Sequence, residues 1–235
     1  MIKLYQFPGA FGMTSLSPYC AKAAAFFCFA NIPYEEINLM STSSAPKKQL
    51  PYIEFPDGKK LGDSQFIINH FQASADTNID AHLTPSQKAE YLCIQALLEE
   101  RLTRIMVYSR WFDTQGWAVI KPLFFHKVPG ILRNFIAGKI RKHIRKMLYI
   151  QGIGRHSQHE IYQLSQQDLQ SLVILLGDKL YFGGEKPCSL DASAYGVLAN
   201  IHYIKLDTEL NRQLERLPTL VAYCERIQQN YFAKR

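Results

Sequence analysis

The four residues Ser17-Pro18-Tyr19-Cys20 stand between a strand-like run, residues 2–7, and an Ala- and Phe-rich stretch of helical composition, residues 21–30. Pro18 suits the first position of a helix because the N–H that it lacks would have no partner there. The four residues match a dithiol redox motif, Cys-Pro-Tyr-Cys, with its first cysteine replaced by serine. They predict a strand, a turn and a helix whose N-terminus has the geometry of a thiol-handling site but not the two-thiol redox couple.

The first third of the chain alternates between strand-like and helix-like runs. Residues 33–38 alternate like a half-buried strand, and residues 50–55 form a second such run before the turn signal at 56–59. Asp63-Ser64 then begin a helical run that ends near Phe71. The order predicts a β-α-β unit followed by a β-β-α unit.

The rest of the chain has helical patterns only. Residues 75–83 are small and polar, which predicts a linker between a first domain at 1–74 and a second at 84–235. Thr84-Pro85-Ser86-Gln87 is a typical helix start, and apolar residues recur at helical spacing from there to Met106. Further helices are predicted near residues 130–149, 157–177, 189–204 and 218–232.

Composition limits where the chain can work. Five cysteines at scattered positions do not form a disulfide framework, so we expect a reducing compartment, the cytoplasm. No apolar run reaches the roughly 18 residues that span a bilayer. The N-terminus has no pattern of a secretory signal. Nothing in the Cys and His spacing predicts a metal site.

The net charge of +7 is concentrated in one segment. Between Asp113 and Glu160 there is no acidic residue, and nine positive ones occur: Lys121, Lys127, Arg133, Lys139, Arg141, Lys142, Arg145, Lys146 and Arg155. Residues 130–149 within it form a basic amphipathic helix. Such a helix can lie on an anionic membrane surface, an acidic partner or a nucleic acid, or it can pack on the core with a solvated positive face. No nucleic-acid motif accompanies it, so we expect no sequence-specific nucleic-acid binding.

Three features together resemble the glutathione transferase superfamily over nearly the whole chain. They are the β-α-β-β-α order with Ser17-Pro18-Tyr19-Cys20, Pro51 at the start of a strand, and Asp63-Ser64 at a helix start, followed by an all-helical half. Residues 181–192 resemble that superfamily's helix-capping segment, with Asp191 bonding back to the cap. Within the superfamily the chain is similar to the failed-axon-connections and metaxin-like branch. The implied fold is an α/β thioredoxin-like N-terminal domain followed by an all-α C-terminal domain.

The resemblance implies that glutathione binds along the first domain, as a co-substrate. Ser17 would face the sulfur, the backbone of Leu50 before a cis-Pro51 would pair with the cysteinyl amide, and Asp63 and Ser64 would hold the γ-glutamyl end. Lys47 or Lys48 would meet the glycyl carboxylate; the sequence does not decide between them. A hydroxyl that donates to sulfur at a positive helix end favours the thiolate, which then attacks a small apolar electrophile.

Each of these roles has a plainer alternative. Ser17 can be only a helix cap, because serine is favoured there. Cys20 is a competing nucleophile, but one turn into the helix it is more often a buried structural thiol. Aromatic residues of the helical half can line the electrophile's pocket or form core: Trp111, Phe112, Trp117, Phe124 and Phe125. The predicted protein is a homodimeric glutathione transferase, or else a non-catalytic interaction protein of the same fold, attached to a membrane surface through residues 130–149.

Overall fold

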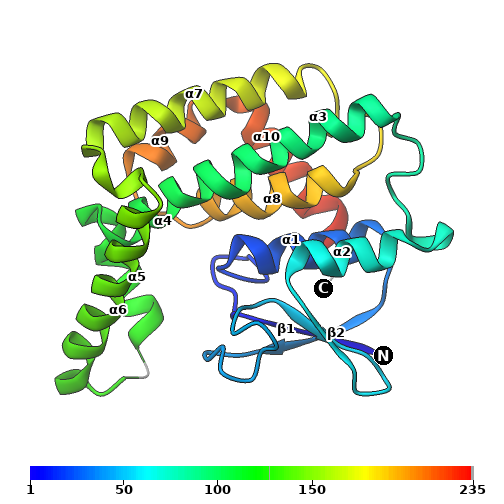
Figure 1. The fold of residues 1–235 in the computed structure, drawn as a ribbon. Helices are drawn as coiled ribbons and strands as arrows, with labels where there is room; N and C mark the ends of the chain where they lie inside the picture. Colours follow the sequence, from blue (N-terminus) through cyan, green and yellow to red (C-terminus); the bar gives the residue numbers. More distant parts are fainter. Residues whose placement is uncertain (127, 234–235) are drawn as a thin grey trace.

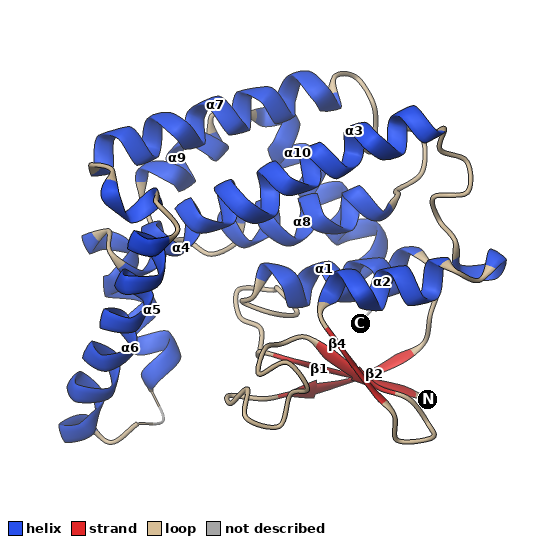
Figure 2. Cartoon of the chain, in the orientation of Figure 1, coloured by secondary structure: helices blue, strands red, loops and turns tan. Residues whose placement is uncertain are grey.

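The computed structural model describes residues 1–126 and 128–233. Its N-terminal part is a mixed sheet covered on one face by two helices, α1 (Pro18–Phe29) and α2 (Ser64–Gln72) (Figures 1 and 2). The strands are β1 (Ile2–Gln6), β2 (Tyr34–Asn38), β3 (Tyr52–Glu54) and β4 (Lys60–Gly62), in the order β2-β1-β3-β4. β1 runs parallel to β2 and antiparallel to β3, and β3 runs antiparallel to β4. The predicted thioredoxin-like arrangement is confirmed.

The predicted linker region contains a short 3-10 helix, η1 (Ala75–Thr77), and a helix begins at Pro85 with the expected capping box at Thr84 and Gln87. This helix continues without a break through three segments, α3 (Pro85–Ala96), the π-helical η2 (Leu97–Leu102) and α4 (Thr103–Trp111). Short π segments inside α-helices are often found at functional sites, because the extra residue per turn redirects side chains and carbonyls.

The remaining helices complete the helical half, most of which lies as a second layer over α1 and α2, with α5 and α6 to one side (Figure 1). They are α5 (Thr114–Phe125), α6 (Gly130–Ile150), η3 (Ile153–Arg155), α7 (Gln158–Leu176), α8 (Ser189–His202), α9 (Glu209–Glu215), α10 (Pro218–Ile227) and η4 (Gln228–Phe232). The all-helical second half is confirmed. The sequence analysis missed α5, whose pattern is interrupted by Pro122, and α9, which is only two turns long.

The two halves of the chain meet where α1 packs on α8. Almost all of α1 is buried, including Ala23, Ala24 and Ala25, so the helix is apolar on every side and lies between the sheet and α8. The backbones come very close, since a Cβ placed on Gly196 of α8 would lie 2.5 Å from the carbonyl oxygen of Pro18. This contact fixes the N-terminus of α1 relative to the helical half.

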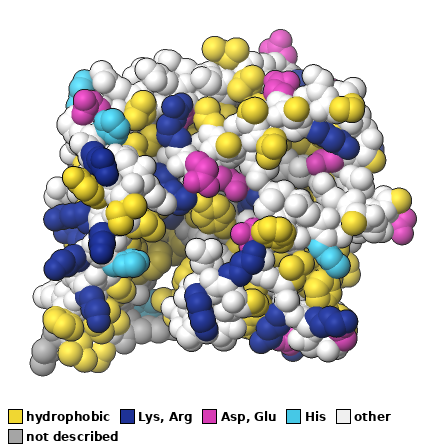
Figure 3. Space-filling model, viewed as in Figure 1, with side chains coloured by type: hydrophobic (Ala, Val, Ile, Leu, Met, Phe, Trp, Pro, Cys, Tyr) yellow, Lys and Arg dark blue, Asp and Glu magenta, His cyan; other side chains and the backbone are white. Residues whose placement is uncertain are grey.

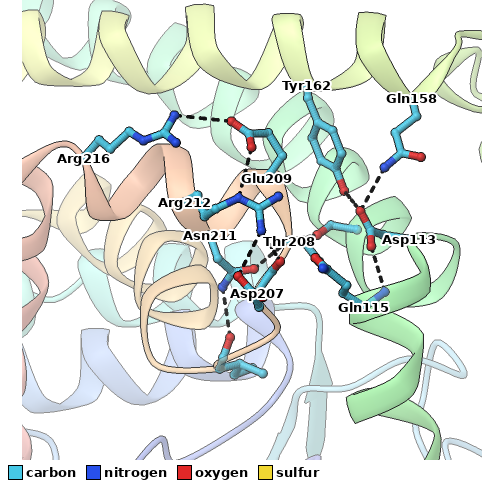
Figure 4. A network of polar contacts seen from close by, with 12 residues as sticks. Asp113, Gln115, Gln158, Tyr162, Asp207, Thr208, Glu209, Asn211, Arg212 and Arg216 are labelled. Atoms are coloured by element: carbon cyan, nitrogen blue, oxygen red, sulfur yellow. Dashed lines mark hydrogen bonds and ion pairs between the residues drawn. The ribbon is translucent and has the colours of Figure 1, made fainter.

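α5 and α6 extend away from the other helices, alongside the N-terminal domain (Figure 1). The buried carboxylate of Asp113 holds the start of α5 (Figure 4). One oxygen caps the helix by accepting from the backbone N–H of Gln115 at 2.9 Å, and the other accepts from Tyr162 at 2.7 Å and Gln158 at 3.1 Å, both on α7. The predicted basic residue Lys127, between α5 and α6, lies outside the described residues.

Candidate active site

A cleft of about 560 Å³ lies between the first domain and the continuous α3–η2–α4 helix. The predicted residues that line it are Ser17, Lys48, Leu50, Pro51, Asp63 and Ser64. They come from three separate stretches of sequence and from the N-termini of both α1 and α2. The structure therefore brings together in one cleft the residues that the resemblance assigned to glutathione.

Ser17 caps α1 and faces the cleft. Its hydroxyl oxygen accepts from the backbone N–H of Cys20 at 3.5 Å, and its own N–H donates to the Ser15 hydroxyl at 3.2 Å. The cap hydrogen bond is long, and accepting it leaves the hydroxyl proton available for donation to a sulfur or oxygen in the cleft. The positive end of the α1 dipole points to the same place. Both the capping and the ligand-facing interpretation of Ser17 are compatible with this geometry.

Cys20 does not line the cleft. Its side chain is fully buried against Ala45, Leu50 and Tyr52. Burial raises the pKa of the Cys20 thiol, and hydrogen bonds to Phe7, Ser17 and Ser15 only partly oppose that rise. A buried, protonated thiol is a poor nucleophile. The structure thus corrects the assignment of Cys20 as a candidate catalytic residue and favours the structural alternative.

The Leu50–Pro51 peptide bond is cis, as expected. In the part of the chain that the structure describes, no hydrogen bond engages the backbone N–H or C=O of Leu50. The carbonyl of Pro51 accepts from the N–H of Asp63 at 3.1 Å, which holds the start of β3 against the start of α2. Leu50 therefore offers an extended backbone edge to the cleft, with the polar groups that a peptide-like ligand can pair with.

Asp63 and Ser64 form the opening of α2. Asp63 has a φ of 87°, a conformation that non-glycine residues rarely adopt and that costs on the order of 1–3 kcal/mol. Its carboxylate accepts from the backbone N–H of Gln65 at 2.9 Å, so it caps the helix. No hydrogen bond among the described residues engages the Ser64 hydroxyl, although Ser64 is only 5% exposed. Strain and an unpaired hydroxyl at a helix N-terminus are both typical of an anion-binding position.

The sequence did not decide whether Lys47 or Lys48 would meet the glycyl carboxylate, and the structure places the two lysines differently. Lys48 lines the cleft, and its ammonium donates to the carbonyl of Ser43 at 2.5 Å. The ammonium of Lys47 instead lies over the ring of Phe66, 4.0 Å from its centroid. Lys48 is accordingly the better placed of the two to meet a carboxylate.

Sequence reasoning missed the polar network behind the α2 end of the cleft. Buried Lys22 on α1 donates to Glu99 of η2 and to Gln65 of α2, both at 2.7 Å. Glu99 also accepts from Ser193 at 2.8 Å. Burial lowers the pKa of Lys22, and the charge of Glu99 opposes that effect. Hydrogen-bonded partners in this network lie 43 to 94 positions apart, so only their shared polarity within apolar helices could have indicated them.

The helical wall of the cleft is polar. Glu100 and Arg104 of the α3–η2–α4 helix form an ion pair of 3.1 Å, and Tyr19 donates to the carbonyl of Glu99 at 3.1 Å. Burial raises the pKa of the Tyr19 phenol, an effect that Arg104 opposes. No aromatic residue of 111–125 lines this cleft. Trp111, Trp117 and Phe124 instead pack together as half-buried side chains on a separate apolar cluster, in which the ring centroids of Trp111 and Trp117 are 5.5 Å apart.

The family comparisons agree with this geometry. Residues 18–116 match the model of the glutathione S-transferase N-terminal domain, and residues 165–227 match that of the glutathione S-transferase C-terminal domain. The isoprene-epoxide–glutathione S-transferase of Rhodococcus sp. (strain AD45) is 31% identical over 237 residues, covering 98% of this chain and 99% of the relative. The chain belongs to the glutathione S-transferase family.

Two further relatives place the chain in the expected branch. Failed axon connections of Drosophila melanogaster is 31% identical and metaxin-1 of Mus musculus 26% identical, each covering 99% of this chain. The chain spans 58% of the length of the first and 76% of the second. A glutathione S-transferase of Ceriporiopsis subvermispora in complex with glutathione has the same fold, with a TM-score of 0.57 at 17% identity, covering 97% of this chain and 96% of that one.

The described residues contain neither a metal-binding cluster nor a membrane-spanning helix. No group of three or more His, Cys, Asp and Glu side chains there is arranged to hold a metal ion. None of the helices in these residues is both long enough and apolar enough to cross a membrane.

Proposed function

We propose that the protein binds glutathione in this cleft and transfers its thiolate to a small electrophile. The observation that carries the proposal is the convergence of the Ser17 hydroxyl, the unpaired Leu50 backbone and Ser64 on one cleft at two helix N-termini. A free thiol with a pKa of about 8.5 is only partly ionised at neutral pH. A hydroxyl that donates to sulfur, together with the α1 dipole, favours the thiolate and so raises the rate of attack.

The polar helical wall changes the expected electrophile. In place of an apolar aromatic pocket, Glu100, Arg104 and Tyr19 line the same cleft as Ser17. We therefore propose a small electrophile with a polar atom next to the reacting carbon. An epoxide has this chemistry, and isoprene epoxide is named for the Rhodococcus relative. The sulfur would bond to an epoxide carbon, the C–O bond would break toward oxygen, and water would protonate the resulting alkoxide.

The reducing cytoplasm remains the proposed location. All five cysteines are free thiols in the structure, and three of them, Cys20, Cys188 and Cys224, are buried. Such a set of thiols fits a compartment that keeps them reduced. A homodimer stays a prediction of the family resemblance.

Calorimetric titration of the full chain with glutathione tests the proposal. We expect saturable binding, and a loss of roughly 10- to 100-fold in affinity for Ser64→Ala, since a hydrogen bond to a charged group contributes about 1.5–3 kcal/mol. Ser74→Ala, an exposed serine past the end of α2 whose side chain makes no capping bond, is the matched control and should bind like wild type. No binding by the folded wild-type chain would overturn the proposal and leave the non-catalytic interaction protein.

A further inference from the structure

One side of α6 carries exposed lysines mixed with bulky, exposed apolar side chains. We call it the outer face of α6 and define it by seven exposed residues: Leu132, Phe135, Lys139, Lys142, Lys146, Tyr149 and Ile150. Their spacing of three and four residues places them on one side of the helix. Figure 3 shows Lys and Arg side chains with hydrophobic ones among them along this edge of the molecule.

The opposite side of α6 packs on the protein. Ala137 and Leu148 are almost fully buried. The guanidinium of Arg141 lies 4.8 Å from the ring centroid of Trp117 and donates to the carbonyl of Trp111 at 2.8 Å. Arg145 lies 5.2 Å from the ring centroid of Phe112. These two arginines therefore have a structural role, and the charge of the outer face comes from its lysines.

The three lysines carry uncompensated charge. No ion pair in residues 1–126 and 128–233 engages Lys139, Lys142 or Lys146. There is no acidic residue between Asp113 and Glu160, so α5 and α6 supply no carboxylate to neutralise them. Clustered unpaired lysines attract an anionic surface over about a Debye length, roughly 8–10 Å at physiological salt.

The apolar residues lie at both ends of the lysine row. Leu132 and Phe135 are 52% and 72% exposed at one end, and Tyr149 and Ile150 are 55% and 65% exposed at the other. At 1.5 Å per residue the two ends are about 26 Å apart. A row of positive charge between two apolar ends suits a bilayer with acidic lipids. The lysines would contact the anionic headgroups, and the apolar side chains would insert among the acyl chains below them.

We propose that the outer face of α6 binds the surface of an anionic lipid bilayer. A second copy of the chain is the less favourable occupant, because a two-fold contact centred on the lysine row would place like charges together. A nucleic acid would satisfy the lysines but leave Phe135 and Ile150 without an apolar partner. Because α6 points away from the cleft-forming helices, this binding does not depend on glutathione.

Cosedimentation of the full chain with vesicles tests the proposal. We expect binding to phosphatidylcholine vesicles that contain phosphatidylserine, weak binding to pure phosphatidylcholine, and loss of binding in high salt. Charge reversal at Lys139, Lys142 and Lys146 to Glu should lower the affinity at least tenfold, since each lysine near such a surface contributes on the order of 1 kcal/mol. Leu132→Ser with Phe135→Ser should weaken binding while its salt dependence is kept.

A matched control uses lysines at the other end of the molecule. Reversal of Lys88, Lys179 and Lys186 to Glu changes the net charge by the same amount at exposed positions, and it should leave vesicle binding within about twofold. Circular dichroism checks that all variants fold, as expected for exposed side chains. Equal binding to both vesicle types, equal loss in both triple variants, or binding to single-stranded DNA but not to vesicles would overturn the proposal. So would a change of oligomeric state on reversal of the three α6 lysines.

Discussion

At the scale of single residues, the site depends on one hydroxyl with two possible tasks. Ser17 caps α1 through a long hydrogen bond and also lines the cleft. Cys20, the thiol left from the redox-like motif, is buried one turn behind it. We propose on this basis that the start of α1 holds the thiol of another molecule, with the Ser17 hydroxyl as the donor.

Ser17→Ala should lower kcat/KM for conjugation by about 100-fold and change glutathione affinity by less than about threefold, because the lost donor acts mainly on the developing thiolate. Ultraviolet titration of bound glutathione should show a higher thiol pKa in the variant, since the donor no longer favours the ionised form. Ser17→Thr keeps the hydroxyl and is the control that should restore most activity. Equal loss of rate and affinity would assign Ser17 to binding or capping alone.

Six of the residues expected at the N-terminal site line one cleft, and they could be named from the sequence because each has a local signature. A serine before a proline at a helix start, a proline opening a strand and Asp-Ser opening a helix are all recognisable over a few residues. Glu99 and Arg104 have no such signature, because they lie on a long amphipathic helix among other charged residues. Only the packing of α3–η2–α4 across the cleft shows that they face it.

At the scale of elements, the start of α8 is held by the buried carboxylate of Asp191. Asp191, three residues into the helix, accepts from the N–H groups of Phe182, Gly183 and Cys188 at 2.7–3.0 Å and from the hydroxyl of Tyr223 at 3.0 Å. Burial raises the pKa of Asp191, and these donors oppose the rise. The predicted bond back to the cap is confirmed, and it is part of a larger junction between α8, α10 and the turn before α8.

Asp191→Ala should destabilise the fold by about 3–5 kcal/mol, because it leaves the N–H groups of Phe182, Gly183 and Cys188 without an acceptor. Urea unfolding followed by circular dichroism measures the change. Tyr223→Phe removes one of the four bonds and should cost about 1 kcal/mol, which keeps the prediction testable if the alanine variant does not fold. Asp76→Ala, at an exposed carboxylate, should have almost no effect. A loss below 1 kcal/mol for Asp191→Ala would show that water replaces the carboxylate.

Element boundaries could be predicted where caps are strong and not where they are weak. The start at Thr84 has a full capping box and was located to the residue. α5 was missed because Pro122 lies inside it, a position at which proline normally ends a helix. α9 begins after Asp207, whose φ of 54° is unusual for a non-glycine residue, and its seven residues are too few for a clear period.

At the scale of the whole molecule, the two halves are joined closely enough to act as one unit. The guanidinium of Arg110 on α4 is buried and donates to the carbonyl of Leu16 at 2.7 Å and to Asn200 of α8 at 2.9 Å. It thereby connects the helical half to the residue just before Ser17. Burial lowers the pKa of Arg110, so the guanidinium depends on these carbonyl acceptors. The position of the donor hydroxyl is consequently set by both domains.

Gly196→Ala tests this coupling. The new methyl would lie 2.5 Å from the carbonyl oxygen of Pro18 and 3.0 Å from the backbone nitrogen of Lys22, so α1 and α8 would have to separate. We expect a loss of about 1–3 kcal/mol, typical of overpacking. Gly138→Ala on α6 meets nothing within 4 Å and is the matched control, neutral or stabilising by up to about 1 kcal/mol. Fluorescence of Trp111 and Trp117 reports on the helical half alone, and circular dichroism reports on the whole chain. If the two halves unfold together, both signals of Gly196→Ala should change at the same urea concentration, with a lower midpoint than wild type and weaker glutathione binding. If the circular dichroism transition separates from an unchanged fluorescence transition, the two halves unfold independently.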